Sequence, residues 1–165
     1  MKFEKVRQEC FERDSVKNIC RVPYCITKAY EGIVLPTRST EMSAGYDFRT
    51  PYDVTLVPGQ RLIIPTGVKA KMEKGEVLLL TVRSSIGIRD GVVFPNSIAL
   101  IDGDYYQNES NDGDIMLALW NTSNNVVRYE AGTRIAQGMF VKFDITEDDN
   151  ATGERGGGIG STGVQ

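Results

Sequence analysis

Short apolar runs between turn signals dominate this chain from Gly32 onward, and they restrict it to a fold made of many short strands. Each run is rich in Val, Ile and Leu and ends at a signal such as Pro58-Gly59 or Lys74-Gly75, and no long stretch repeats at the 3.6-residue period of a helix. One short helical turn is expected at residues 85–90. The expected strands are residues 33–35, 53–57, 61–64, 66–72, 76–82, 91–94, 97–101, 114–120, 125–129 and 134–142. This spacing favours an all-β sandwich, jelly roll or barrel.

The length of 165 residues suits a single domain over residues 1–165. Residues 2–7 read either as a strand or as the start of a short amphipathic helix, whereas residues 8–31 are polar, mixed and without a clear period. We therefore interpret residues 8–31 as an insertion that packs on the surface of the assembly or binds a partner. An acidic stretch, Glu147–Asn150, marks the border of a C-terminal tail, residues 150–165, which we expect to be mobile.

Composition excludes several classes of protein and site. A net charge of −3 gives no electrostatic footprint for nucleic acid. No apolar run approaches the ~18 residues of a membrane span, and no signal peptide is visible, so we expect a cytoplasmic protein without nucleic-acid or membrane partners. The absence of histidine removes Ser-His-Asp and Cys-His nucleophiles and imidazole metal ligands. The cysteines, Cys10, Cys20 and Cys25, are expected to be free thiols.

The end of the chain is rich in glycine. Six of the eleven residues from Gly153 to Gly163 are glycine, and Arg155 and the pair Ser161-Thr162 lie among them. Successive N–H groups of such a segment can form a concave nest for an anion, and arginine adds a forked donor for phosphate oxygens. The tail is either a flexible terminus or a segment that closes over a phosphorylated ligand.

Four further segments place reactive side chains at the ends of apolar runs. Asp102 follows the run 97–101, where a carboxylate either caps a hairpin or accepts a proton from water. The segment Arg83–Ser85 follows another run and suits phosphate oxygens, or is a simple surface strand end. Gly132–Gln137 and Ser43–Asp47 are weaker signals when each is taken alone.

Together the five segments resemble the trimeric all-β dUTPase family. The motifs of that family are Ala-Gly-Tyr-Asp, Arg-Ser-Ser/Gly, Ile-Asp-x-Asp/Gly-Tyr, Gly-x-Arg-Ile-Ala-Gln and Arg-x-Gly-Gly-Phe-Gly-Ser-Thr-Gly, and counterparts of all five occur in order between Gly32 and Gly163. The resemblance implies a distorted jelly-roll β-barrel that hydrolyses dUTP to dUMP and pyrophosphate, which keeps uracil out of DNA and supplies dUMP for dTMP synthesis. It also implies a homotrimer in which one subunit gives the uracil hairpin, a neighbour the phosphate motifs and the third its tail.

The resemblance also assigns roles to residues. Asp102 is similar to the general base for the water that attacks the α-phosphorus, and Tyr105 to the residue that packs on the deoxyribose and excludes a 2′-hydroxyl. A hairpin is expected to read uracil, mainly through backbone groups, and includes Asn96, Leu100, Ile101 and Met116. Phosphate contacts are expected from Arg83, Ser84, Ser85 and Gln137, and tail contacts from Arg155, Gly160, Ser161 and Thr162. Asp47 and Arg134 are expected to support the site.

A magnesium requirement is implied by the same resemblance. Mg²⁺ prefers oxygen ligands, retains water and often sits on substrate phosphates. Because the triphosphate supplies the direct ligands in this family, no protein metal ligand is assigned.

Two departures from the family concern the tail and the hairpin. Ile159 stands where the family tail carries phenylalanine, and loses base stacking worth roughly 1–3 kcal/mol in single-strand binders. We expect a working but weaker closure, which Ile159→Phe should improve by lowering KM or raising kcat. Residues 106–113 form a polar loop longer than in the shortest family hairpins, either at the mouth of the site or on an uninvolved surface.

Two other functions compete with dUTP hydrolysis. The related dCTP deaminases require a glutamate in the strand after the hairpin, and Ala118 occupies that place here. A nucleotide-sensing regulatory protein with weak turnover is the second alternative, with a protein partner bound through residues 8–31 or 106–113.

Overall fold

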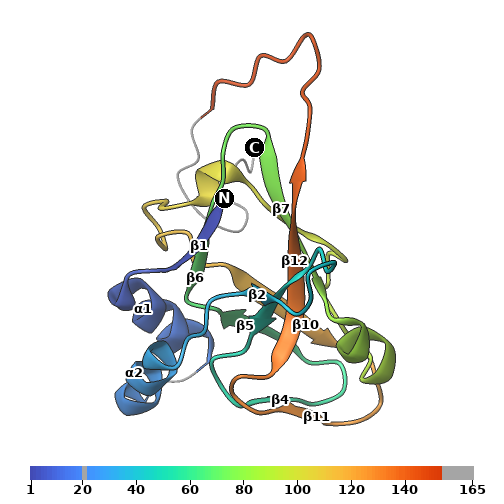
Figure 1. The fold of residues 1–165 in the computed structure, drawn as a ribbon. Coiled ribbons are helices and arrows are strands. Elements are labelled where there is room, and N and C mark those ends of the chain that lie inside the picture. Colours follow the sequence, from blue (N-terminus) through green and yellow to red (C-terminus); the bar gives the residue numbers. More distant parts are fainter. Residues whose placement is uncertain (20–21, 154–165) are drawn as a thin grey trace.

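The chain forms a jelly-roll-like β structure with two helices at one side (Figure 1). The computed structural model describes residues 1–19 and 22–153. The described strands are β1 (Lys2–Lys5), β2 (Thr37–Arg38), β3 (Tyr46–Arg49), β4 (Val54–Leu56), β5 (Arg61–Pro65), β6 (Val68–Lys71), β7 (Glu76–Val82), β8 (Val92–Val93), β9 (Ala99–Ile101), β10 (Met116–Asn121), β11 (Val127–Tyr129) and β12 (Arg134–Lys142). They pair as β2-β3-β12-β7-β9, β5-β10-β8, β1-β6 and β11-β4.

The core lies between these sheets because their strands bury alternate residues. Leu78 and Leu80 of β7 are buried, as are Leu117 and Leu119 of β10, and all four belong to one apolar cluster. Successive side chains of a strand point to opposite faces of the sheet, so this period of two leaves the other residues of each strand toward the outside. The prediction of an all-β jelly-roll fold is confirmed.

Residues 8–31, whose sequence shows no clear period, contain two helices. These are α1 (Gln8–Asn18) and α2 (Pro23–Glu31), and α1 buries Cys10, Phe11, Asp14 and Ser15. The buried positions of α1 have helical spacing, but two of them are polar, which hides the period from a hydrophobicity pattern. A small second core joins α1 and α2 to the barrel, where the rings of Phe11 and Tyr52 stack with centroids 5.9 Å apart. Within the described ranges, no helix has the length and apolar character needed to cross a membrane.

Most predicted strands are present with small shifts of their ends, and three differences remain. No strand forms at residues 33–35, and the short β2 follows Pro36 instead. Strand β3 was missed because its sequence, Tyr-Asp-Phe-Arg, contains two charged residues. Residues 2–5 form a strand, one of the two alternatives, and a π-helical turn at Ser85–Arg89 matches the helical turn expected at residues 85–90.

Candidate active site

Three of the sequence motifs meet because β12 is the central strand of the five-stranded sheet. Gln137 of β12 pairs with Asp47 of β3 on one side and with Thr81 of β7 on the other. Arg83 immediately follows β7, and its backbone N–H donates to the carbonyl of Ile135 at 3.1 Å. The sheet register therefore gathers the Ser43–Asp47, Arg83–Ser85 and Gly132–Gln137 segments at one place.

A buried carboxylate organises two arginines at this place. Asp47 is 7% exposed; its Oδ1 lies 3.0 Å from Nε of Arg83, and its Oδ2 accepts a hydrogen bond from Arg134 at 3.0 Å. The hydroxyl of Ser39 donates to Oδ2 at 3.0 Å and accepts from Arg134 at 3.1 Å. We call Ser39, Asp47, Arg83 and Arg134 the Asp47 cluster. Its two guanidinium groups are partly exposed, so they can meet an anion from solvent.

The two serines beside Arg83 face solvent. Ser84 and Ser85 are exposed and stand at the start of the π-helical turn, whose first N–H groups, those of Ile86 and Gly87, donate to the Arg83 carbonyl at 2.9 and 3.0 Å. These bonds fix the backbone that carries the hydroxyls next to the Asp47 cluster.

The second half of the site is the hairpin 96–116. In the part of the chain that the structure describes, β9 pairs with β7, and β10 pairs with β5 and β8, so the two limbs belong to different sheets and do not pair with each other as the expected hairpin would. We call this segment the hairpin 96–116 for its two limbs alone. Asn96 and Leu100 are exposed on the first limb, Ile101 is half-buried, and Met116 is half-buried at the start of β10. The three non-glycine residues with positive φ in the described ranges, Ser97, Gln107 and Asp112, all lie in the hairpin. Such conformations tend to gather at functional sites.

Tyr105 and Asp102 lie where the first limb turns. Asp102 directly follows β9 and is half-buried, and its carbonyl accepts from the Tyr105 N–H at 3.1 Å. Tyr105 is 6% exposed, and its hydroxyl donates to the carbonyl of Asp114 at 2.8 Å. The side chain of Asn111 donates to that hydroxyl at 2.8 Å, so the tyrosine ring is held from within the hairpin.

Burial raises the pKa of the Asp114 carboxyl well above its usual value, although N–H groups of Gly67 and Thr66 oppose the shift. Oδ1 accepts from those N–H groups at 2.8 and 3.1 Å, whereas Oδ2 is buried without a hydrogen-bond partner among the described residues. Asp114 therefore joins the second limb to the turn between β5 and β6.

Within a single copy of the chain, Asp102 does not lie near the Asp47 cluster. Ile101 pairs with Leu78 in the antiparallel register of β9 and β7, whereas Arg83 lies five residues farther along β7, beyond its other end. Asp102 follows Ile101 and is therefore level with Val77, six residues from Arg83, so with a rise of about 3.3 Å per residue the two backbone positions are on the order of 20 Å apart along the strand direction. The candidate base and the arginine cluster therefore lie at opposite ends of β7.

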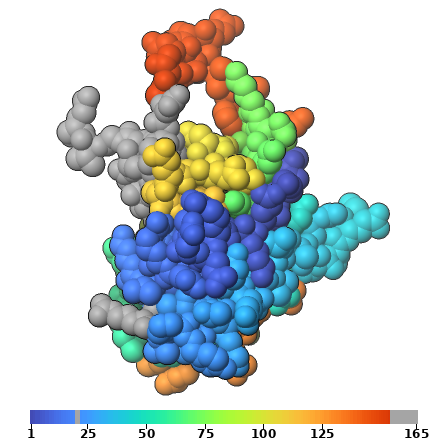
Figure 2. Space-filling model, turned by 90° about the vertical axis from the view of Figure 1, so that its left-hand side faces the viewer, coloured from blue at the N-terminus to red at the C-terminus, as the bar shows by residue number. Residues whose placement is uncertain are grey.

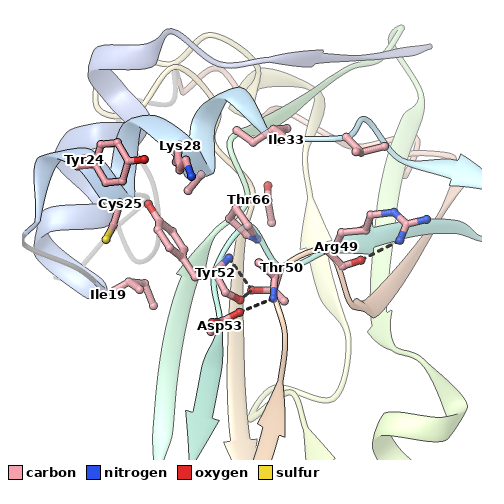
Figure 3. Close-up of a pocket in the computed structure, with 16 residues that line it drawn as sticks. Ile19, Tyr24, Cys25, Lys28, Ile33, Arg49, Thr50, Tyr52, Asp53 and Thr66 are labelled. Atoms are coloured by element: carbon pink, nitrogen blue, oxygen red, sulfur yellow. Dashed lines mark hydrogen bonds between the residues drawn. The ribbon is translucent and has the colours of Figure 1, made fainter.

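Sequence reasoning missed Ser39, whose contact with Asp47 joins a loop to a strand and follows no local motif. The predicted tail residues Arg155, Ile159, Gly160, Ser161 and Thr162 lie outside the described residues, as do the other residues from 154 onward. A cavity of about 690 Å³ opens between α2 and the loop Arg49–Asp53 (Figure 3), but none of the predicted site residues lines it.

A metal ion could reach this site bound to the phosphates of a ligand. Across residues 1–19 and 22–153, no group of three or more Cys, Asp or Glu side chains could hold a metal ion. The half-buried Asp102 is a hard oxygen donor that can face such an ion or its water, which is compatible with Mg²⁺ bound to phosphate oxygens.

Comparison with known proteins identifies the family. The dUTPase family model matches residues 31–163. The deoxyuridine 5′-triphosphate nucleotidohydrolase of Lactococcus lactis is 44% identical over 135 residues, which cover 81% of this chain and 90% of that protein. The crystal structure of dUTPase from Streptococcus mutans is 42% identical with a TM-score of 0.65, and the match covers 68% of this chain and 88% of that one. The dUTPase of phage phi11 of Staphylococcus aureus shares the fold at 21% identity, with a TM-score of 0.61 over 74% of this chain and 92% of its own. The chain therefore belongs to the dUTPase family, the dUTP diphosphatases.

Proposed function

We propose that this protein hydrolyses dUTP to dUMP and pyrophosphate in an Mg²⁺-dependent reaction. The family membership supports the substrate, and the Asp47 cluster, which presents two arginines on one buried carboxylate, is the observation that carries the proposal. The order of the motifs and their distribution over the fold agree with this reaction.

Asp102 is the proposed general base. Its carboxylate accepts a proton from a water molecule as the water oxygen bonds to the α-phosphorus, and the bond from that phosphorus to the bridging oxygen of the β-phosphate breaks. Pyrophosphate leaves, and the proton stays on Asp102 until solvent takes it. A position directly after a paired strand holds the carboxylate rigidly, as such a base requires.

The phosphate-binding half neutralises and orients the triphosphate. The ion pair through Nε of Arg83 leaves its terminal nitrogens for phosphate oxygens, and the exposed hydroxyls of Ser84 and Ser85 add donors beside it. Gln137 completes this half, while Asp47 and Arg134 position Arg83. Bound Mg²⁺ supplies further charge neutralisation on the phosphates.

The nucleoside-binding half is the hairpin 96–116. Backbone groups near Asn96, Leu100, Ile101 and Met116 read uracil, and the buried ring of Tyr105 packs on the deoxyribose. The tail residues Arg155, Gly160, Ser161 and Thr162 close over the γ-phosphate, with Ile159 near the base.

The active protein is proposed to be a homotrimer with shared sites. A backbone separation on the order of 20 Å between Asp102 and Arg83 along β7 is too large for both to act on one α-phosphate. A second copy that places its Asp47 cluster next to the first copy's hairpin removes this difficulty.

Release of pyrophosphate from dUTP, dCTP, dTTP and UTP with Mg²⁺ tests the proposal directly. The wild-type protein should act rapidly on dUTP alone, and Asp102→Asn should abolish the release while leaving dUTP binding intact. Release of pyrophosphate from none of the four, without ammonia from dCTP, would sink the enzymatic function and leave the nucleotide-sensing alternative. Ammonia formed from dCTP, with or without pyrophosphate, would indicate a deaminase.

A further inference from the structure

The N-terminal segment and the loop 106–113 form one structural unit. In Figure 2 the α1 region (blue) lies below the yellow part of the hairpin 96–116, and the start of the chain (darkest blue) lies beside it. The hydroxyl of Tyr106 donates to Glu4 of β1, and the side chain of Arg13 on α1 donates to the carbonyl of Ser110. The insertion 8–31 and the loop 106–113 therefore contact each other.

Asp112 is at the centre of this contact. It is 4% exposed, and its Oδ2 accepts from Nζ of Lys69 and from the backbone N–H of Arg7, each at 2.8 Å. Lys69 is itself 6% exposed, and its Nζ also lies 5.3 Å from the ring centre of Tyr106. A buried carboxylate with a buried ammonium partner depends on that partner, because an unpaired charge in such a place is strongly unfavourable.

A short path leads from Asp112 to the nucleoside-binding residues. The preceding residue, Asn111, donates to the Tyr105 hydroxyl at 2.8 Å and to the Asp114 carbonyl at 3.1 Å. Asn108 donates to the Tyr105 carbonyl and to the side chain of Asn111, both at 2.8 Å. The loop therefore passes any displacement of Asp112 to the ring and backbone of Tyr105.

The same contact forms a cleft. A cavity of about 480 Å³ has residues of α1 on one wall and residues of the hairpin on the other. Arg13 and Lys17 belong to the first wall, and Tyr105 and Met116 belong to the second. The position of α1 therefore bounds the space beside two residues proposed to contact the nucleoside.

We propose that Asp112 is a positioning residue, through which β6 and the link between β1 and α1 hold Tyr105 in the place that discriminates deoxyribose from ribose. This inference rests on the proposed dUTPase function and extends it to the N-terminal segment. Lys69, the N–H of Arg7 and the Arg7 guanidinium, whose Nε lies 3.7 Å from Oδ1, are the groups that hold Asp112. Tyr106 is a second link between the hairpin and the same segment.

The test compares Asp112→Asn with Glu9→Gln. Asn keeps the acceptor for the Arg7 N–H and tolerates the φ of 60° at this position, but it loses the charge that pairs with Lys69. Glu9 pairs with the same Arg7 in an exposed bridge at 3.0 Å and does not contact the loop, so it controls for changes in α1. Steady-state kcat and KM are measured for dUTP and UTP, together with hydrogen exchange of residues 103–116.

The variant Asp112→Asn should raise KM for dUTP and lower the ratio of kcat/KM for dUTP over UTP about tenfold, with kcat for dUTP little changed. Exchange in residues 103–116 should quicken, and Glu9→Gln should match the wild type. The double variant Lys69→Met with Asp112→Asn removes both buried charges, so it should recover thermal stability while keeping the loss of selectivity. Recovered thermal stability without recovered selectivity indicates a positioning role for Asp112. If Asp112 only stabilised the fold, the double variant would recover selectivity together with stability.

Two outcomes overturn the inference. Unchanged selectivity in Asp112→Asn and in the double variant, with wild-type activity on dUTP intact, removes the role of Asp112 and leaves the dUTPase function standing. A wild-type protein that does not hydrolyse dUTP removes the function itself and the inference with it.

Discussion

Three aspartate side chains of this molecule have different surroundings, and we expect different roles for them. Asp47 is buried against two arginines and a serine, Asp112 against a lysine and a backbone N–H, and Asp102 stands half-buried at the end of a strand. The first two have partners that fix them in one orientation. Asp102 is the proposed general base, and its half-buried position leaves part of the residue open to solvent.

Replacing Asp47 should damage activity more than it damages the fold. Asp47→Asn removes the charge that orients Arg83 and Arg134, so kcat/KM for dUTP should fall by at least about tenfold through misplaced phosphate contacts. The loss in unfolding free energy should be only about 1–2 kcal/mol, because both guanidiniums are partly exposed and screened by solvent.

The control for this measurement is Asp53→Asn. Asp53 accepts one hydrogen bond, from the N–H of Ala131 at 2.8 Å, and lies outside the motifs. Equal kcat/KM values for the two variants would contradict the orienting role of Asp47.

Asp114 should make stability depend on pH. Burial raises its pKa in the folded state above the unfolded value of about 3.9, so its contribution is fully present below that pH and is lost as pH rises through the folded pKa. Asp114→Asn keeps an acceptor for the Thr66 and Gly67 N–H groups but does not ionise. The Tm of this variant relative to wild type should therefore increase as pH rises from 4 to 8, while the exposed control Asp144→Asn shows no such trend. A difference in Tm that is constant with pH would show that Asp114 does not titrate in this range.

At the scale of elements, the hairpin 96–116 depends on a glycine for its closure. Gly113 has a φ of +85°, and a Cβ there would lie 2.8 Å from the Tyr105 carbonyl oxygen and 3.0 Å from the Gln107 nitrogen. Both neighbours are backbone atoms of the opposite side of the loop, so they cannot rotate away as a side chain would. Gly113, the residue that follows Asp112, therefore has no space for a side chain.

Gly113→Ala should lower the unfolding free energy by about 2 kcal/mol or more, from backbone strain together with the clash. Gly132→Ala is the matched control, because Gly132 has the same φ of +85° but no heavy atom within 4 Å of a built Cβ. That control should cost only about 1 kcal/mol for the backbone conformation. Urea unfolding measures both values, and equal losses would show that the loop relaxes around the added methyl group.

Local elements were more predictable than their joining contacts. The apolar runs at 76–82 and 134–142 were predicted with the bounds of β7 and β12, because their patterns need no distant partner. The motif residues could be found as a set, but the sequence could not place Asp102 and Arg83 at opposite ends of β7. Helix α1 was missed since its buried face includes Asp14 and Ser15, and α2 buries only Ile26 and Ala29, which is too few apolar residues to show a period. The contact of Asp112 with Arg7 spans 105 residues, so no local pattern indicates it.

At the scale of the whole molecule, the proposed sharing of sites predicts complementation between inactive variants. Asp102→Asn and Arg83→Gln should each be nearly inactive alone. When they are unfolded together in equal amounts and refolded, a site that takes its base from one copy and its arginine from another is intact in about a quarter of cases. Pyrophosphate release should therefore recover to about a quarter of the wild-type rate.

In the control, the two variants are refolded separately, mixed, and assayed before their subunits can exchange. Sedimentation of the refolded material should report a trimer. No recovery in a mixture that forms mixed trimers would mean that base and arginine act within one chain.

The tether between Arg7 and Asp112 also has a consequence for the order of synthesis. A ribosome adds roughly 5–20 residues per second, so Asp112, 105 residues downstream, is made roughly 5–20 s after Arg7. Tyr52, which stacks on Phe11, emerges much earlier. The nascent first helix can therefore meet Tyr52 well before Asp112 exists, and a polypeptide released before residue 112 would carry that helix without its contact to the loop.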